Sequence, residues 1–466
     1  MSTVAAVPAE AQAFVGDSVD RLIERYGGRA PRYTSYPTAV QFVPSITTRE
    51  YVAWLESLRR DAGAVSLYLH IPFCDRMCWY CGCNTAVVNR RGPIEDYVAR
   101  LLREIDLVAD TLPQRLLAGS VHFGGGTPNM LAPDEVGAIL AKLAERFDFA
   151  PGAEIAAEID PRTLTPEWVR AAAAGGMNRA SLGVQDFDPK VQQAINRQQS
   201  FALTKSVVDG VRARGAVSVN LDLLYGLPHQ TVESVEATVR QALSLRPDRI
   251  ALFGYAHVPW FKKHQTMIDE AWLPGLQERF VQAQQASKTI REAGYAAIGI
   301  DHFALPGDSL AVAAAEGRLH RNFQGYTDDG YHTVIALGPS GISRFRQGYA
   351  QSTAATSSYE KMVWDGSMPV ARGIELTGED AARGWLIERL MCDFAFRVDD
   401  LAERFGSLAQ PLLDQAIQLS KREPEMLMLE GDNFVVPEPQ RPIVRIIAAR
   451  FDSYLRLGNA AHSAAV

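Results

Sequence analysis

Short apolar runs alternate with amphipathic stretches from about residue 65 to residue 255, and this alternation limits most strongly the folds that the chain can adopt. The apolar runs predict strands at residues 65–71, 120–123, 154–158, 179–184, 217–223 and 250–255. The stretches between them predict helices at residues 95–109, 133–147, 165–174, 203–214 and 231–245. Strands that alternate with helices form a parallel sheet covered by the helices. The six units predict an α/β fold, an incomplete (β/α)6 TIM-like barrel.

Residues able to do chemistry follow the predicted strands at the points where the strands end. They are His70 with the cysteine-rich loop after it, residues 124–128, Glu158 with Asp160, Gln185, Asp222 with Tyr225, and residues 255–257. In such barrels the active site lies at the carboxyl ends of the strands. We therefore expect these residues to meet at one end of the barrel.

The cysteines form a local group. Four of the five, Cys74, Cys78, Cys81 and Cys83, lie close together, while Cys392 stands alone. The C-x-x-x-C-x-x-C spacing of the first three suits a [4Fe-4S] cluster that leaves one iron open, to which S-adenosylmethionine can bind. The cysteine spacing therefore predicts a radical S-adenosylmethionine enzyme. The alternative is a zinc site with Cys83 as the fourth ligand, although zinc usually joins cysteine pairs from separate segments.

The other motifs leave alternatives open. The glycine run at residues 124–126 is followed by Pro128 and Asn129, which is a poor match to a dinucleotide-binding turn. These glycines let the backbone approach a ligand closely, or they form a tight turn without one. Glu158 and Asp160 bind a cofactor or are solvated carboxylates at the barrel rim. The histidines at positions 70, 257, 302 and 320 have equally ordinary structural roles.

The composition restricts the partners. The formal charge of -7, from 47 Lys plus Arg and 54 Asp plus Glu, argues against a surface that binds nucleic acid. The first residues do not resemble a secretory signal, and no apolar run reaches the length of about 18 residues that a membrane span needs. We expect a cytoplasmic protein that binds neither nucleic acid nor a membrane.

Three regions are expected along the chain. Residues 1–50 comprise a helix at 18–26 and an extended arm that covers the active site, and residues 51–375 form the catalytic barrel and its extension. Residues 376–466 form a mostly helical, winged-helix-like domain. Its predicted helices lie at 380–391, 398–405, 410–421 and 443–457, with a hairpin within 426–436.

Several motifs spread over nearly the whole chain resemble those of the oxygen-independent coproporphyrinogen III oxidases, a radical S-adenosylmethionine family. They are residues 68–83 (YLHIPFCDRMCWYCGC), 32–38 (RYTSYPT), 124–128 (GGGTP), 183–187 (GVQDF), 220–228 (NLDLLYGLP), 255–257 (YAH), 301–304 (DHFA) and 320–326 (HRNFQGY). The resemblance implies anaerobic haem biosynthesis, in which two propionates of coproporphyrinogen III become vinyl groups through a 5′-deoxyadenosyl radical. Protoporphyrinogen IX is the product.

The resemblance also implies roles for single residues. Cys74, Cys78 and Cys81 are the expected ligands of the [4Fe-4S] cluster, and Tyr68, Glu158 and Asp222 are the expected catalytic residues. Two molecules of S-adenosylmethionine are expected. The contacts of the first are Tyr68, Gly125, Glu158 and Ile342, and those of the second are Tyr80, Gly126, Thr127, Gln185, Arg197, Asp222 and Ala256.

The substrate of that family carries four carboxylates, for which basic side chains are the natural partners. The candidates are Arg29, Arg32, Lys262, Lys263 and Arg321. A flavodoxin- or ferredoxin-type electron donor and a monomeric state are expected. We also expect the arm around Tyr33 to shield the reaction from solvent, so that deletion of residues 1–37 uncouples cofactor cleavage from substrate turnover.

Three other functions compete with this one. A haem-binding relative (a haem chaperone) and a radical methyltransferase share the same cluster loop. Cys83 and the long N-terminal segment favour the oxidase, because the haem-binding relatives usually lack both. A zinc-stabilised binding module is the alternative without catalysis.

Overall fold

The computed structural model describes residues 30–455, and its centre is a run of parallel strands in chain order. They are β1 (Val65–Ile71), β4 (Leu117–Gly125), β5 (Asp148–Ile159), β6 (Arg179–Gln185), β7 (Ser218–Tyr225) and β8 (Arg249–Gly254). Each pairs in parallel with the next. All six predicted strands are therefore present, and their carboxyl ends lie at one edge of the sheet.

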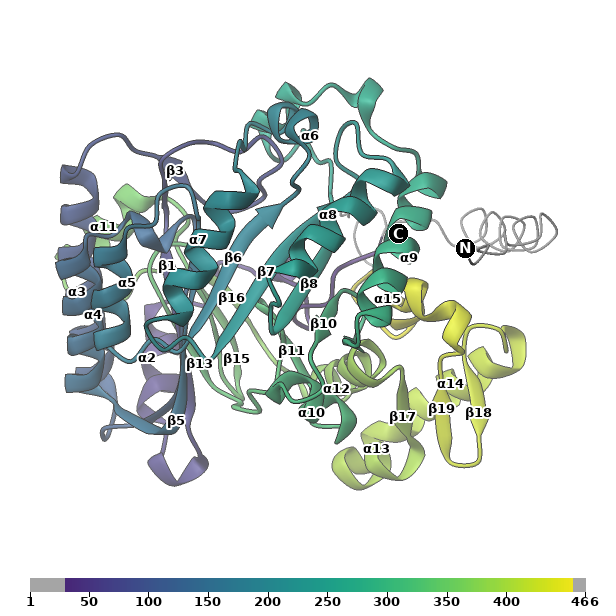
Figure 1. Ribbon diagram of the computed structural model, residues 1–466. Coiled ribbons are helices and arrows are strands. Elements are labelled where there is room, and N and C mark those ends of the chain that lie inside the picture. The colour runs from purple at the N-terminus through teal and green to yellow at the C-terminus, as the bar shows by residue number, and fades with distance from the viewer. Residues whose placement is uncertain (1–29, 456–466) are drawn as a thin grey trace, which may run out of the picture.

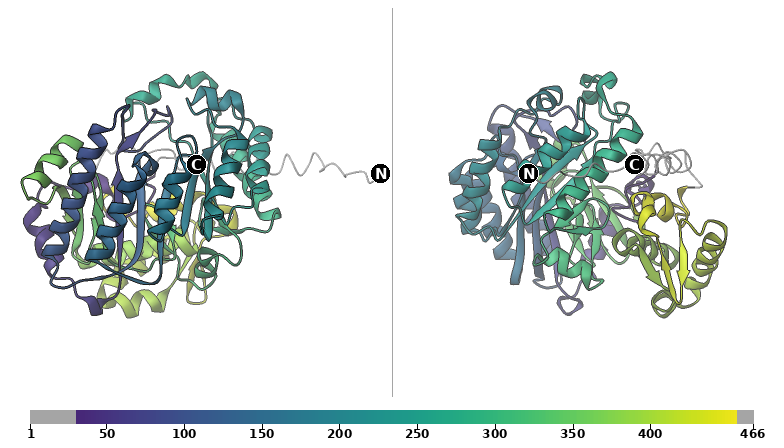
Figure 2. Two further views of the ribbon diagram at one scale, coloured as in Figure 1. Left: turned by 60° about the vertical axis from the view of Figure 1, so that its left-hand side comes forward. Right: turned by 45° about the vertical axis from the view of Figure 1, so that its right-hand side comes forward.

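Helices cover the outer face of this sheet (Figures 1 and 2). They are α3 (Gly92–Thr111), α4 (Pro133–Arg146), α5 (Pro166–Ala174), α7 (Phe201–Arg212) and α8 (Val232–Ser244). Thr165, Ser200 and Thr231 cap three of them, because each side chain accepts a hydrogen bond from a backbone N–H of the first turn. The buried residues of α3 recur every three or four positions, which gives the helix one apolar face against the sheet.

The sheet continues beyond the predicted strands at both edges. On the β1 side, β13 (Val334–Leu337) adds a parallel strand, and β14 (Ile342–Arg344), β15 (Gly348–Ser352) and β16 (Val370–Glu375) follow in antiparallel fashion. On the β8 side lie β10 (His302–Ala304) and β9 (Ala296–Ile298). Within residues 30–455 the twelve-stranded sheet has β16 and β9 at its edges, so the barrel is open.

Shorter elements connect these units. They are η1 (Ala39–Gln41), α2 (Thr48–Glu56), η2 (Arg60–Ala62), β2 (Phe73–Cys74), β3 (Ala86–Val87), η3 (Pro128–Met130), α6 (Pro189–Ala194), η4 (Lys263–Met267), η5 (Glu270–Trp272), α9 (Leu276–Glu292), α10 (Ser309–Ala315), β11 (His320–Asn322), β12 (Gly325–Thr327) and α11 (Thr356–Trp364). None of the helices in the described part of the chain is long and apolar enough to cross a membrane.

The C-terminal region packs around a hydrophobic core of its own. It comprises α12 (Gly378–Asp393), β17 (Ala395–Arg397), α13 (Val398–Phe405), η6 (Gly406–Leu408), α14 (Ala409–Arg422), β18 (Met428–Glu430), β19 (Asn433–Val435), η7 (Glu438–Ile443) and α15 (Val444–Ala449). In Figure 2 this region, in yellow-green, lies beside the open side of the sheet. The three strands form one small sheet.

The last predicted helix is wrong in its extent. The residues from 443 to 457 were expected to be helical, but α15 ends at Ala449. The Asp452 carboxylate accepts hydrogen bonds from the backbone N–H groups of Tyr454 and Leu455, which holds this stretch in a turn. The predicted helix at 18–26 lies outside the described residues.

The arm at residues 30–37 packs into the C-terminal core. Tyr33 and Tyr36 are buried members of that core, and the Tyr33 hydroxyl donates to Asp452 Oδ2 over 3.0 Å. The Arg32 guanidinium donates to the carbonyl of Gly254, at the end of β8, over 3.4 Å. The arm therefore joins the C-terminal region to the end of the barrel strands where the expected site lies.

Candidate functional site

The cysteine loop follows β1, and two segments hold its backbone in place. Asn196, just after α6, donates to the Met77 carbonyl over 2.8 Å. From the segment after β8, Lys262, His264 and Gln265 donate to the carbonyls of Cys83, Cys81 and Tyr80 over 2.9, 2.7 and 3.0 Å. Residues far apart in the sequence thus fix the loop at the carboxyl end of the sheet.

Each of the three predicted ligand thiols has hydrogen-bond donors beside it. Thr85 and Thr127 direct their hydroxyls at Cys74 Sγ over 3.1 and 3.4 Å. The Cys83 backbone N–H lies 3.4 Å from Cys81 Sγ.

At Cys78 the donors are two guanidinium groups. Arg162 and Arg197 direct nitrogens at Cys78 Sγ over 3.3 and 3.5 Å. Both arginines pair with Asp160, at 2.7 and 3.3 Å. Donors and positive charge at sulfur stabilise a ligating thiolate, so these surroundings fit an iron–sulfur cluster.

The thiol pKa values differ with the surroundings. Burial raises the pKa of Cys74, although the hydrogen bonds from Thr127 and Thr85 oppose this. The interaction with Cys83 lowers the pKa of Cys81 to about 6, and His264 and Lys262 add positive charge. The surroundings therefore favour a thiolate at Cys81 over one at Cys74.

The arrangement of possible metal ligands is relevant to the zinc alternative. Within residues 30–455 no group of three or more His, Cys, Asp or Glu side chains is close enough to hold one metal ion. A zinc site needs its donors around a single ion, whereas a cluster spreads its ligands over several irons. The described residues therefore hold no ready-made donor set for a single zinc ion.

The loop opens onto a cavity of about 490 Å³ at the carboxyl ends of the strands. The predicted site residues that line it are Arg32, Cys74, Cys78, Tyr80, Cys81, Gly125, Gly126, Thr127, Glu158, Gln185, Arg197, Asp222, Ala256 and Lys262. The alternation of strands and helices brings these residues together from six strand ends.

Four predicted residues do not line this cavity. Tyr68 lies on β1 behind Glu158, and Ile342 lies on β14, which pairs with β13 and β15. Lys263 begins η4, and Arg321 lines a second hollow. Arg29 lies outside the described residues.

Tyr68 is fixed by a hydrogen-bonded pair. His70 Nε2 lies 2.8 Å from the Asn84 carbonyl, which can only accept, so Nε2 carries the proton. The free Nδ1 then accepts from the Tyr68 hydroxyl over 3.1 Å. Burial lowers the pKa of His70 and, with the charge of Glu158, raises the pKa of Tyr68 well above its usual range. Both side chains are neutral at physiological pH.

Glu158 and Asp222 are the two carboxyl groups of the cavity that are expected to be catalytic. Glu158 accepts from the Gly125 backbone N–H and lies 3.3 Å from His122 Nε2. Asp222 accepts from Asn220 and Ser181 over 2.7 and 3.1 Å. Burial, and then the charge of Glu158, raises the pKa of Asp222 to about 6. Asp222 is therefore the carboxyl that gains or loses a proton close to neutral pH.

The glycine run is required by the protein's own packing. A Cβ on Gly125, whose φ is +112°, would lie 2.7 Å from the His70 ring. A Cβ on Gly126 would lie 2.6 Å from the Phe73 carbonyl oxygen. The N–H groups of Gly126 and Thr127 donate to the carbonyls of Ile71 and Phe73 over 2.8 and 2.7 Å. The run thus holds the strand end against the cysteine loop, whether or not a ligand also approaches it.

The sequence analysis missed Arg162 as a site residue. It lines the cavity, donates to Cys78 Sγ and lies two residues beyond Asp160. Its place just past the end of β5 was the available signal, because the other residues were found by that rule.

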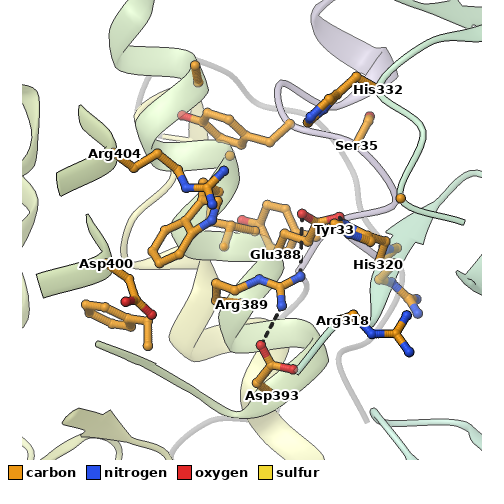
Figure 3. A pocket seen from close by; sticks show the side chains of 18 of the residues that line it. Tyr33, Ser35, Arg318, His320, His332, Glu388, Arg389, Asp393, Asp400 and Arg404 are labelled. Atoms are coloured by element: carbon orange, nitrogen blue, oxygen red, sulfur yellow. Dashed lines mark hydrogen bonds and ion pairs between the residues drawn. The ribbon is translucent and has the colours of Figure 1, made fainter. Parts of the chain in front are cut away.

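A larger hollow of about 1330 Å³ lies between the arm, β11 and the C-terminal region (Figure 3). Its wall is densely charged, and some of these charges pair with one another. Arg389, for example, pairs with Asp393 at 2.6 Å and with Glu388 at 3.7 Å. None of the cysteines lines it.

Comparison with known proteins gives a consistent result. The model of the Radical SAM superfamily matches residues 68–242. The oxygen-independent coproporphyrinogen III oxidase of Bradyrhizobium diazoefficiens is 47% identical over 439 residues, which cover 94% of this chain and 97% of the relative. That of Paracoccus denitrificans is 41% identical over 95% of this chain and 99% of the relative.

A solved structure agrees with these relatives. The coproporphyrinogen III oxidase from Escherichia coli, described as a radical SAM enzyme, superposes with a TM-score of 0.85 at 34% identity. The match covers 91% of this chain and 97% of that one.

Proposed function

The chain belongs to the family of oxygen-independent coproporphyrinogen III oxidases, and from this we propose that it converts two propionates of coproporphyrinogen III to vinyl groups, which gives protoporphyrinogen IX. It is a radical SAM oxidoreductase of haem biosynthesis. The observation that carries the proposal is the cavity at the strand ends. Three cysteines line it together with residues expected around the cofactor, and hydrogen-bond donors point at the cysteine sulfurs. The relatives' names favour neither a haem chaperone nor a methyltransferase.

Cys74, Cys78 and Cys81 would hold the [4Fe-4S] cluster. When bound, the cluster and S-adenosylmethionine supply a carbon-centred radical that takes a hydrogen atom from a propionate carbon. The protein's part is to hold the thiolates, and Arg162 and Arg197 do this at Cys78. Thr85 and Thr127 do the same at Cys74.

Tyr68, Glu158 and Asp222 would act as the catalytic residues. Glu158 presents a carboxylate to the cavity, and the Gly125 N–H orients it. The Tyr68 hydroxyl donates a hydrogen bond to His70 Nδ1 and keeps its proton, because burial and the charge of Glu158 raise its pKa. Asp222, on β7 and with its pKa raised to about 6, can take up a proton within the cavity.

Two molecules of S-adenosylmethionine are part of the proposal. All seven residues expected around the second, Tyr80, Gly126, Thr127, Gln185, Arg197, Asp222 and Ala256, line the cavity, which supports a ligand there. Of the residues expected around the first, Gly125 and Glu158 line it, and Tyr68 lies behind Glu158. Ile342 has the least support, because it lies on β14 outside the cavity wall.

Arg32 and Lys262 line the cavity and are proposed as cations for the substrate carboxylates. Lys262 also donates to the Cys83 carbonyl, which leaves fewer of its protons for a ligand. We further propose a cytoplasmic monomer served by a flavodoxin- or ferredoxin-type donor, as the family resemblance implies.

The proposal is tested by turnover. The anaerobically reconstituted protein is incubated with dithionite, S-adenosylmethionine and coproporphyrinogen III, and the products are separated by chromatography. We expect protoporphyrinogen IX together with 5′-deoxyadenosine, and neither product from Cys78→Ala. Cofactor cleavage without decarboxylation in the wild type would refute the proposal.

A further inference from the structure

Four arginines meet near Gly254, where β8 ends at the cavity. Arg32 donates to the Gly254 carbonyl over 3.4 Å, and Arg279 donates to the next carbonyl, that of Tyr255, over 2.6 Å. A Cβ on Gly254 would lie 2.9 Å from the Tyr225 hydroxyl and 3.4 Å from Arg279 Nη2. The carbonyl, the phenol and two guanidinium groups thus share one small space.

Arg445 and Arg321 complete this arginine cluster. Arg445 donates to the backbone carbonyls of Ala30 and Pro31, directly before Arg32. Arg321 lies on β11, 3.9 Å from Asp301 Oδ1, and the Asp301 backbone carbonyl accepts from Leu252 N–H on β8 over 2.7 Å. The arm, the C-terminal region and β11 each contribute a guanidinium.

Arg321 has more unmet hydrogen-bonding capacity than Arg279, in which Nε alone lacks a partner. It is only 7% exposed, and its Nε and Nη1 have no hydrogen-bond partner. A buried guanidinium without full partners is unfavourable, and an anion that accepts from both nitrogens would relieve it. This observation points to a negatively charged ligand.

The charges do not balance among the described residues. Arg32 and Arg321 face one described carboxylate, Asp301, which is also held by His302 Nδ1 at 2.6 Å, and Arg279 adds a further positive charge. Burial, and then Arg32 and Arg321, lowers the pKa of Arg445 to about 10. The pKa of Arg32 is lowered by burial too, although the side chain is open to the cavity. The surroundings therefore carry an excess of positive charge that more than one carboxylate would offset.

The cluster lies at some distance along the sheet from Glu158. Glu158 is on β5, whereas Arg32 contacts the end of β8, three strands further along the sheet. Arg32 lines the cavity and Arg321 lines the larger hollow beyond the arm. A substrate with one propionate near Glu158 would extend its other propionates towards this side.

We propose that Arg32 and Arg321 bind the propionate carboxylates that are not being oxidised, and that Arg279 and Arg445 are positioning residues for them. Arg445 holds the backbone next to Arg32, and Arg279 holds the carbonyl next to the one that Arg32 contacts. The inference rests on the proposed function, and it names the tetracarboxylate as the feature that selects the substrate.

The test measures binding of coproporphyrin III, the stable oxidised form that keeps the four carboxylates, and of its tetramethyl ester in the same buffer. Affinities are obtained by absorbance titration for the wild type, Arg321→Gln and Arg321→Lys. Arg212→Gln is the matched control, because Arg212 also donates to backbone carbonyls but lies on α7, away from the cavity. Iron content and thermal melting show that each variant is folded.

We expect Arg321→Gln to weaken binding of the tetra-acid roughly 10- to 100-fold, the usual effect of a lost charged hydrogen bond, and to leave the ester unaffected. Arg321→Lys should recover part of the loss, and Arg212→Gln should bind as the wild type does. Unchanged tetra-acid affinity, or an equal loss for acid and ester, overturns the inference.

If Arg321→Gln does not fold, Arg32→Gln takes its place, since Arg32 is open to the cavity. The same selective loss supports the site, and wild-type affinity overturns it. A wild type that binds the tetra-acid through these arginines but forms no protoporphyrinogen IX supports the carboxylate site and refutes the proposed function.

Discussion

Two guanidinium groups beside one cysteine give Cys78 surroundings that the other two ligand candidates lack. Arg162 and Arg197 both reach Cys78 Sγ, and Asp160 holds both in place. Burial alone would raise the pKa of Asp160, but Arg197 and Arg162 keep it below its usual value. Arg162, Arg197 and Asp160 therefore form one ion-paired group beside a single sulfur.

Removing one hydrogen-bond donor of this ion-paired group should make the cluster harder to reduce. Hydrogen bonds to ligand sulfur stabilise the reduced, more negative cluster. We expect Arg162→Gln to lower the midpoint potential in an anaerobic redox titration monitored by electron paramagnetic resonance. Arg170→Gln, an exposed arginine on α5, is the control and should leave the potential unchanged. A potential that does not move in Arg162→Gln would contradict the role assigned to this arginine.

Glu104 gives a prediction about pH. It is buried on α3, accepts from Tyr359 and the Gly338 N–H, and burial raises its pKa from 4.5 to about 7. The folded state therefore keeps a proton that the unfolded state releases. The associated stability is fully present below pH 4.5 and is lost as the pH rises through about 7.

Glu104→Gln should remove this loss. At pH 8 we expect the variant to exceed the wild type in free energy of unfolding by on the order of 3 kcal/mol at most, with little difference at pH 4.5. Urea unfolding at the two pH values measures it. Glu145→Gln, an exposed carboxylate on α4, should show no such change. A wild type as stable at pH 8 as the Glu104→Gln variant would refute the prediction.

At this scale the sequence identified residues whose neighbours are close along the chain. The cysteine spacing and the residues at strand ends were enough to predict most of the cavity wall. Asn196 and His264 were not predicted, because they meet the loop across 119 and 183 residues, whereas Arg162 was missed although it lies just past the end of β5. Only the folded sheet creates those contacts.

Among the elements, the six β/α units were predictable because each repeats a buried strand and an amphipathic helix. The predicted and observed bounds of β1 are identical, and those of α4 differ by one residue. The strands β13 to β16 were not predicted. They are three to six residues long, and β13 finds its parallel partner β1 more than 260 residues earlier, so no local pattern reveals them.

The turn after β4 should tolerate no side chain at Gly126. The added Cβ would meet the Phe73 carbonyl, which belongs to the backbone that leads into Cys74. Gly126→Ala should cost roughly 1–3 kcal/mol of overpacking and lower the iron bound after reconstitution. Gly137→Ala is the matched control, because this helical glycine has open space around it and should gain stability. Full iron occupancy in Gly126→Ala would contradict the account.

For the whole molecule, the arm connects two hydrophobic cores. Tyr33 and Tyr36 belong to the C-terminal core, while Arg32 contacts β8 of the barrel. The sequence predicted an arm over the active site, and the bounds of the three regions remain predictions. The sequence could not show that the arm is anchored in the C-terminal region, because the partner of Tyr33 lies 419 residues away.

Removing the hydrogen bond between Tyr33 and Asp452 should affect the coupling of cofactor cleavage to substrate turnover more than the assembly of the cluster. Tyr33→Phe leaves Asp452 Oδ2 without its buried donor, a loss of about 1–3 kcal/mol. We expect normal iron content but more 5′-deoxyadenosine released per protoporphyrinogen IX. Tyr454→Phe removes a similar bond, to Asp380, within the C-terminal region alone and should keep the wild-type ratio. An unchanged ratio in Tyr33→Phe would exclude the shielding role of the arm.

The central claim is that this cavity directs a radical at a propionate of coproporphyrinogen III. The most direct measurement uses substrate deuterated at the propionate β-carbons, with mass spectrometry of the 5′-deoxyadenosine released during anaerobic turnover. The account predicts one deuterium in each 5′-deoxyadenosine that accompanies a new vinyl group. Vinyl formation with unlabelled 5′-deoxyadenosine would contradict it.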